Sequence, residues 1–181
     1  MTTKQFVPRC LLAAASFCLL FAACDPLGTR GSGDLSTENR DEKNFHALEV
    51  HVPGTVEIRT DSVYKVQVTC EESIIAYLET IEDNGVLKIL FDRDVYDVDN
   101  LKILVSAPNW DRIEVNGSGD VFALNCPVKT AIVTVSGSGN IQLTASESLQ
   151  ATISGSGDVS YKGNPQITKS ISGSGRLKKI D

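Results

Sequence analysis

The sequence predicts an all-β protein: a parallel β-helix-like solenoid with coils of about 18–20 residues, and an irregular or hairpin-containing first half. The main observation is a Gly-Ser-Gly element that occurs four times. Its leading glycines are Gly117, Gly137, Gly155 and Gly173, so the steps between copies are 20, 18 and 18. Such a nearly fixed period indicates stacked supersecondary units. From Phe45 onward, short runs that alternate apolar and polar residues and are rich in β-branched side chains predict strand after strand.

Aliphatic columns around the repeats support the stacked arrangement. The column two residues before the first glycine consists of Val115, Val135, Ile153 and Ile171. The column two residues after the second glycine consists of Val121, Ile141, Val159 and Leu177. A third column, on the remaining side of the coil, consists of Ala131, Leu149 and Ile167. Each repeat therefore reads as a strand, a corner, a second strand and a return. The longer first step has its two extra residues near Cys126 and Pro127, a natural place for a bulge.

The glycines have a mechanical reason. A sharp corner between stacked coils requires backbone conformations that glycine adopts cheaply, and it leaves little space for a Cβ atom. We therefore expect the repeat residues to form structural corners, with ladders of serine and of the residue that follows the second glycine. These residues are Gly117, Ser118, Gly119 and Asp120; Gly137, Ser138, Gly139 and Asn140; Gly155, Ser156, Gly157 and Asp158; and Gly173, Ser174 and Gly175, followed by Arg176.

The first half carries different signals. Pro53-Gly54 separates two alternating runs, and Asn84-Gly85 lies between two more. Asn-Gly between apolar alternating runs is a strong hairpin signal, because a type I′ turn needs positive φ at both central residues. An antiparallel sandwich of short strands is the competing architecture. A sandwich explains the alternation equally well, but it does not explain the nearly constant spacing of the Gly-Ser-Gly elements.

The N-terminus reads as a lipoprotein leader. Lys4 and Arg9 precede an apolar run, Leu11 to Ala23, that is too short to span a membrane and has the length of a signal peptide. Phe21-Ala22-Ala23-Cys24 resembles a bacterial lipobox, in which the signal is cut before the Cys and that Cys is acylated; a plain signal peptide with a coincidental Cys is the alternative. We therefore expect a signal peptide over 1–23, lipidation at Cys24, a flexible tether over 24–43, and one domain over 44–181. The protein would be exported and anchored through its lipid, with the outer membrane as the expected location.

Charge and cysteine content exclude several classes. The chain has 17 basic and 23 acidic residues, and because Lys4 and Arg9 precede Cys24, 15 basic residues remain after it against all 23 acids. Nucleic acid is therefore not an expected partner, since it favours basic surfaces. Cys70 and Cys126 either form a disulfide in an exported chain or stay free and buried. Two cysteines without CxxC spacing, and His46 and His51 as the only histidines, argue against zinc, and no cofactor is expected.

Together these features resemble the head GIN domain family, the auto-transporter adhesin head domain. The features that carry the resemblance are the leader with its lipobox, the Gly/Ser-rich segment after it, Phe45 opening an alternating run, and the repeated Gly-Ser-Gly-Asp/Asn followed by an aliphatic residue. The similarity to the domain itself covers about residues 31–181. The resemblance implies a right-handed β-helix-like fold and export to the cell envelope. It implies no enzymatic activity. Arg176 departs from the Asp/Asn pattern, which puts a uniform function of the ladder in doubt.

Three kinds of chemistry can be weighed. Calcium is disfavoured, because the half-steps between copies lack a second Gly-rich turn and the ladder runs Asp, Asn, Asp, Arg. A glycan-active lyase or hydrolase is the alternative function; it would need acids such as Asp92, Asp94, Asp97 and Asp99 with Glu114 and Asp120. The serines are not nucleophile elbows, since they lack the Gly-x-Ser-x-Gly form and no His lies in the repeats.

A non-catalytic adhesin or scaffold module is therefore the predicted function, with a glycan or a protein as its ligand. The candidate aromatic contacts are Tyr64, Tyr77, Tyr96, Trp110, Phe122 and Tyr161. Trp110 serves equally well as a cap on the solenoid core. Open coil ends also predict homo-oligomers through the solenoid ends, because an uncapped strand edge pairs with other chains.

Overall fold

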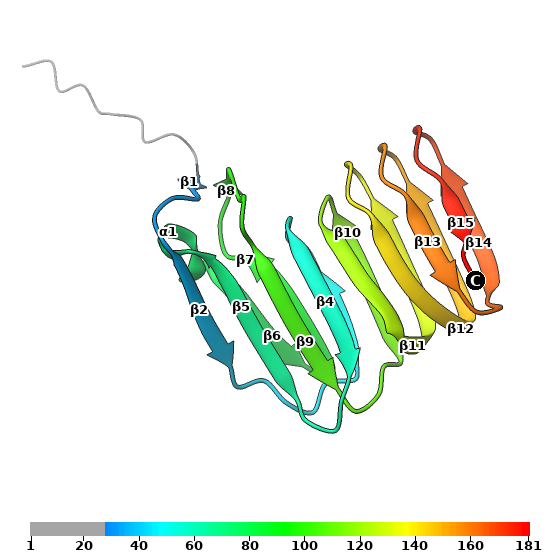
Figure 1. Cartoon of the computed structure of the whole chain (residues 1–181), viewed down its shortest axis with the longest axis horizontal. Helices are drawn as coiled ribbons and strands as arrows, with labels where there is room; N and C mark the ends of the chain where they lie inside the picture. The colour runs from blue at the N-terminus through cyan, green and yellow to red at the C-terminus, as the bar shows by residue number, and fades with distance from the viewer. Residues whose placement is uncertain (1–27) are drawn as a thin grey trace, which may run out of the picture.

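The computed structural model describes residues 28–181 and shows an all-β chain (Figure 1). The predicted signal peptide and Cys24 lie outside the described residues. The first seven strands and the helix are β1 (Thr29–Arg30), β2 (Leu35–Arg40), β3 (Ala47–Val50), β4 (Thr55–Thr60), β5 (Lys65–Glu71), α1 (Glu72–Ile75), β6 (Leu78–Asp83) and β7 (Val86–Phe91). The other strands are β8 (Val95–Tyr96), β9 (Lys102–Ala107), β10 (Arg112–Gly117), β11 (Asp120–Val135), β12 (Ile141–Ile153), β13 (Val159–Lys162), β14 (Gln166–Ile171) and β15 (Leu177–Lys179).

Thirteen of the strands belong to one mixed sheet that curls into two facing layers, because β11 and β12 are long enough to contribute to both. The first layer runs β2-β5-β9-β4, then the start of β11, the start of β12, β13 and β15. The second runs β6-β7-β3-β10, then the end of β11, the end of β12 and β14. The prediction of an all-β fold is thus confirmed, but a purely parallel sheet is not what the chain forms.

The repeat region pairs in parallel with fixed offsets. In the second layer, Ile113, Ala131, Leu149 and Ile167 are aligned at a constant step of 18. In the first layer, Val121, Ile141, Val159 and Leu177 are aligned at steps of 20, 18 and 18. All but the last member of each set are buried between the layers. Alternation therefore fills one continuous core, as a sheet with one dry face requires.

One predicted column is wrong at its first member only, because Val135, Ile153 and Ile171 are aligned as predicted. Val115 pairs with Val133, and Val135 pairs with Gly117. The corner from Gly117 to Val121 is two residues shorter than the corner from Val135 to Ile141, and register shifts between Ala123 and Thr130 take up the difference. The irregularity near Cys126 and Pro127 lies where the sequence placed it. The shorter corner from Gly117 to Val121, which accompanies this irregularity, could not be detected by aligning the glycines alone.

The first half of the chain is mixed. Strands β6 and β7 form an antiparallel hairpin around Asn84 and Gly85, whose φ angles of 52° and 82° are both positive. Strand β5 is antiparallel to both β2 and β9, whereas β7 joins β3, and β9 joins β4, in parallel. The unit of β7 and β9 therefore stacks on one side of the unit of β3 and β4, and the unit of β10 and β11 stacks on the other. The order of these strand pairs in the stack therefore differs from their order along the chain.

The prediction of a flexible tether over 24–43 is wrong for the described part. Residues Leu35–Arg40 form β2, which pairs with β5 at six positions. Gly31-Ser32-Gly33 precedes it, and the backbone N–H of Ser32 donates to Ser73 Oγ. Every second residue of β2 is exposed, as on an edge strand with one solvated face. Its polar composition therefore resembles that of a linker.

Candidate ligand-binding groove

The corner glycines lie in close contact from coil to coil. The second glycine of each copy is buried (Gly119, Gly139, Gly157 and Gly175), whereas the serine before it is exposed. A Cβ atom at Gly157 would strike the carbonyl oxygen of Gly139, and one at Gly175 would strike that of Gly157. Gly119 continues the stack onto Gly54, whose carbonyl oxygen would be 2.8 Å from an added Cβ. The backbones at these corners are too close for any side chain.

The residue after the second glycine links neighbouring coils. Asp120 Oδ1 accepts the backbone N–H of Asn140 at 2.6 Å, and Asp158 Oδ1 accepts that of Arg176 at 3.0 Å. Asn140 Oδ1 accepts the N–H of Asp158 at 3.4 Å between them. A side-chain oxygen is needed only where a later coil presents an N–H. Arg176 departs from Asp/Asn and acts as a donor, because its guanidinium donates back to Asp158 at 2.6 Å.

The structure does not gather the candidate acids into a site. Asp92 pairs with Arg93, Asp97 with Arg30, and Glu114 with Arg112. Arg93 holds the pKa of the Asp92 carboxyl below its ordinary value by donating hydrogen bonds to it. Asp94 and Asp99 are exposed in the same loop. Within residues 28–181 no group of three or more His, Cys, Asp or Glu side chains is arranged to hold a metal ion.

The candidate aromatic residues divide into core and surface. Trp110 is 3% exposed, packs near Phe45, and donates its indole N–H to the carbonyl oxygen of Arg59 at 3.0 Å. The ring of Tyr64 contacts Phe45 edge-on, and Tyr161 is buried at 8% exposure. Tyr77 is half-buried beneath the guanidinium of Arg93. Only Phe122 and Tyr96 present large exposed surfaces, 37% and 39% respectively.

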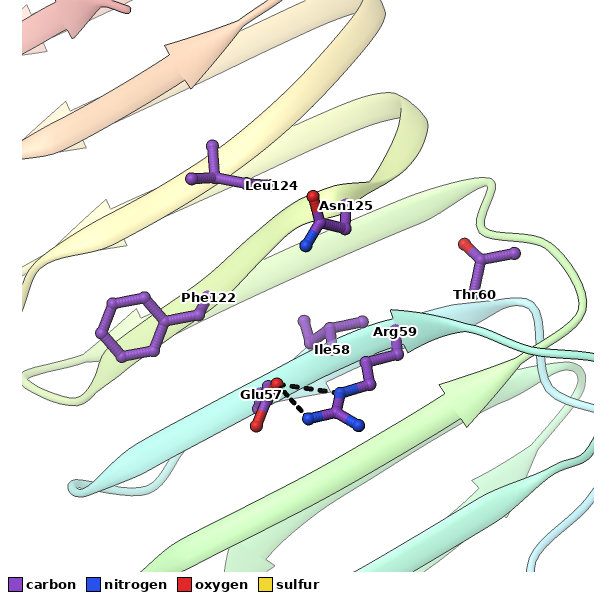
Figure 2. Close-up of a pocket in the computed structure, with 7 residues that line it drawn as sticks. All are labelled: Glu57, Ile58, Arg59, Thr60, Phe122, Leu124 and Asn125. Carbon is purple, nitrogen blue, oxygen red and sulfur yellow. Dashed lines mark hydrogen bonds and ion pairs between the residues drawn. The ribbon is translucent and has the colours of Figure 1, made fainter.

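Phe122 lies beside a groove between β4 and β11 (Figure 2). The groove is open to solvent and has a volume of about 390 Å³. It exists because the two strands pair only through Thr55–Glu57 and Asp120–Phe122, after which the register shift carries β11 away. It is lined by Glu57, Ile58, Arg59, Thr60, Phe122, Leu124 and Asn125.

Two polar side chains of the groove, those of Glu57 and Arg59, are paired with each other. Glu57 Oε1 accepts two hydrogen bonds from Arg59, at 2.8 Å from Nε and 2.6 Å from Nη2. This pair and the amide of Asn125 lie on either side of the groove, with the Phe122 ring at one end (Figure 2). The arrangement offers one apolar ring, one carboxylate, one guanidinium and one amide, which together can stack against an apolar face and hydrogen-bond to hydroxyl groups.

Sequence reasoning named Phe122 as a candidate and missed Glu57, Arg59 and Asn125. The signal that could have found them is the break at Cys126 and Pro127, because a bulge beside a straight neighbouring strand leaves a gap in the sheet. The break itself is firmly built. Cys126 is fully buried, and its thiol donates to the carbonyl oxygens of Ile58 at 3.5 Å and Ala123 at 3.3 Å.

Both described cysteines are free and buried, so the alternative of a disulfide between them is not realised in this structure. Burial raises the pKa of the Cys126 thiol to about 12. Burial also raises the pKa of Cys70 to about 11, with the nearby carboxylates of Glu71 and Glu38 adding to the effect. Neither thiol is a nucleophile at neutral pH, because the reactive form is the thiolate.

Comparison with known proteins places the chain in a family. A family model described as "Putative auto-transporter adhesin, head GIN domain" matches residues 44–123 and 109–165. The chain therefore belongs to the head GIN domain family, as the sequence predicted. None of the curated proteins matches it.

Solved structures resemble it in fold. A putative cell adhesion protein from Clostridium sporogenes has a TM-score of 0.50 at 10% identity, covering 81% of this chain and 100% of that one. A putative adhesin from Bacteroides fragilis has a TM-score of 0.45 at 19% identity (84% and 100% covered). A putative lipid binding protein from Parabacteroides distasonis has a TM-score of 0.43 at 20% identity (84% and 99% covered). In residues 28–181, no helix has the length and apolarity needed to cross a membrane.

Proposed function

We propose that the chain is a non-catalytic binding head of the cell envelope that holds a saccharide in the groove between β4 and β11. The observation that carries the proposal is the exposed Phe122 ring beside the Glu57–Arg59 pair and Asn125. A sugar ring has apolar C–H faces that stack on an aromatic ring and hydroxyl groups that pair with planar polar groups. Rigid strands supply these groups with little ordering cost on binding.

The adhesin-type family and neighbours support a role in attachment at the envelope. Several finer points are also proposals. We propose that residues 1–23 are a signal peptide, that Cys24 carries lipid, and that the protein is held at the outer membrane. We propose that the coils wind right-handed as a β-solenoid; the parallel pairing at a constant step supports this description.

A glycan array tests the saccharide proposal. We expect the mature chain to bind a subset of glycans and Phe122→Ala to lose at least about tenfold in affinity, as when an aromatic contact that carries much of the binding energy is truncated. Tyr96→Ala is the matched control, because it removes an equally exposed aromatic ring from β8, outside the groove. Equal binding by Phe122→Ala and the parent chain on every glycan would overturn the proposal.

The same array separates binding from catalysis. Bound glycans are incubated with the chain and screened for hydrolysis or lyase products. The binding proposal expects the glycans to remain intact, because Asp92 and Asp97 of the Asp92–Asp99 loop form ion pairs with Arg93 and Arg30. Turnover that disappears on changing one of those acids would establish the glycan-active alternative instead.

A further inference from the structure

The two ends of the strand stack have opposite charge. The strands at one end, β2 and β6, contain one basic and four acidic residues, and residues 28–100 as a whole contain seven basic and sixteen acidic residues. Residues 160–181, which build the end with β14 and β15, contain five basic residues and one acidic residue. These ends lie at opposite extremes of the long axis (Figure 1). A molecule of this kind attracts a second copy most strongly when unlike ends meet.

Both ends also present strand edges with free backbone groups. Among the described strands, β2 pairs only with β5, β6 only with β7, β14 only with β12, and β15 only with β13. Edges of this kind are templates for pairing with another chain. Because β6 is antiparallel to β7 while β14 runs with its layer, a second copy stacked on the first would place β14 and β6 as an antiparallel pair.

Apolar side chains gather on the same edges. Of the seven large apolar residues that are strongly exposed in the described chain, four lie on the end strands: Leu35 on β2, Ile81 on β6, and Ile167 and Ile171 on β14, at 54%, 42%, 40% and 40% exposure. All six residues of β14 are exposed, although Ile167 and Ile171 align with buried residues of β12. Two aliphatic columns of the core therefore end in side chains that are exposed to solvent.

Lysines at the basic end favour one orientation. Lys169 aligns with the buried Ala151, and Lys179 with the buried Tyr161, so two columns that are apolar inside the stack end in lysine. Two basic ends would oppose these lysines to their own copies, and two acidic ends would oppose the Glu79, Glu82 and Asp83 of one β6 to those of the other. Like charges brought together in this way suppress the wrong pairings.

The acidic end has an open hollow of about 300 Å³, whose lining includes Arg40, Glu42, Leu78, Glu79 and Ile81. Glu42 Oε1 accepts a hydrogen bond from Thr80, but Glu42 Oε2 is buried there without a partner, as is Arg40 Nε. A carboxylate left without a full set of partners is costly, so this part of the surface favours an incoming ammonium group over a second carboxylate.

From these observations we propose that the protein associates head-to-tail, with β14 and β15 of one copy meeting β6 and β2 of the next. Each such contact leaves one free acidic end and one free basic end, so the assembly is an open row and not a closed dimer. The inference is independent of the saccharide groove, which lies on the face between β4 and β11.

Site-directed cross-linking of the full chain tests the orientation. Two chains with different tags are co-expressed, one with Ile81→Cys and the other with Ile167→Cys, and the cells are treated with a short bismaleimide. We expect a mixed cross-linked product, and a ladder of larger products when both substitutions are in one chain. Cys70 and Cys126 are fully buried, and the parent chain, which also carries Cys10, Cys18 and Cys24, measures the background from the chain's own cysteines.

The single variants are the decisive controls. Cross-linking of Ile81→Cys chains only with each other would show acidic ends meeting, and Ile167→Cys chains only with each other would show basic ends meeting. Either result overturns the proposal, as does the absence of any mixed product when thermal melting shows both variants to be folded. If the tagged chains are cross-linked only to a different protein, the ends bind that partner, and the head-to-tail proposal is overturned.

Charge reversal supplies an independent readout. We expect Lys169→Glu on β14, the strand proposed to meet β6, to weaken association of the mature chain about tenfold in light scattering. Combining it in mixtures with a Glu79→Lys, Glu82→Lys chain should restore mixed association. High salt should weaken the parent association, because exposed charges are screened. A strict monomer at all concentrations and salts would refute the head-to-tail arrangement.

Discussion

Gly157 shows how little freedom a corner residue has. It is buried, and an added Cβ would strike the backbone carbonyl oxygen of Gly139 in the coil beneath. Because backbone atoms cannot move aside as a flexible side chain can, the coils must separate locally. We expect Gly157→Ala to lower the free energy of unfolding by about 1–3 kcal/mol, the usual cost of overpacking.

The neighbouring serine provides the matched control for that measurement. Ser156 is exposed at the same corner, and its side chain makes no hydrogen bond in the described structure. Ser156→Ala is therefore expected to change the free energy of unfolding in urea by less than about 0.5 kcal/mol. Equal destabilisation by the two substitutions would show that the corner tolerates a Cβ and that packing there is looser than described.

The buried thiols predict an alkaline limit to stability. The folded pKa of Cys126 is raised by burial to about 12, above the value near 9.0 of an exposed thiol. The folded state therefore disfavours the thiolate, so the thiol's contribution is complete below pH 9 and is lost as the pH rises towards 12. We expect the free energy of unfolding to fall over this window less steeply in Cys126→Ala than in the parent chain. Identical slopes would contradict the assignment.

At the scale of elements, Asp158 joins the last two coils. Its carboxylate accepts the backbone N–H and the guanidinium of Arg176, and these donors hold the pKa of Asp158 below its ordinary value. We expect Asp158→Ala to speed hydrogen exchange in β15, because the coil loses the contacts that fix its start. Mass spectrometry of peptides from residues 172–181 measures the change.

Asp158→Asn separates the two contacts. An amide oxygen can still accept the backbone N–H, as Asn140 does one coil earlier, but it cannot form the ion pair with Arg176. Exchange in β15 should therefore be slower in Asp158→Asn than in Asp158→Ala. If both variants exchange like the parent chain, the ladder does not hold the coil in place.

The repeats could be predicted from sequence because glycine and aliphatic residues keep one phase. Ala131, Leu149 and Ile167 are aligned as their spacing requires, since every residue between them belongs to a coil of fixed length. The order of the early strands could not. β4 and β9 both bury their second and fourth residues, and no residue in either marks which neighbour it will join. Pairing of equivalent patterns is decided by the core that forms between them.

The groove and β2 escaped prediction for related reasons. The groove depends on where β11 leaves β4, which is set by a change of register and not by the character of any one side chain. Phe122 was a candidate because it is aromatic, whereas Glu57 and Arg59 look like ordinary solvated strand residues. Leu35–Arg40 has the composition of a linker, and only its partner β5 makes it a strand.

At the scale of the whole molecule, the proposed anchor makes a direct prediction. If Cys24 carries lipid, the parent chain should fractionate with membranes, and Cys24→Ala should be released in soluble form, because the acyl chains would be what holds it at the bilayer. Metabolic labelling with a fatty acid and the mass of the N-terminal peptide measure the modification. An unlabelled parent chain would leave a plain signal peptide as the correct interpretation of the leader.

The difference between chain order and space order has a consequence in time. During synthesis, β3 and β4 are complete before either of their neighbours exists, and their second flank stays open until β10 and the start of β11 have been made. Contacts that close over such separations slow folding and leave strand edges exposed to aggregation. Coil-by-coil growth, which stacked repeats normally permit, can therefore begin only after residue 123. The domain should accordingly mature in one late, concerted step, followed by rapid addition of the regular coils.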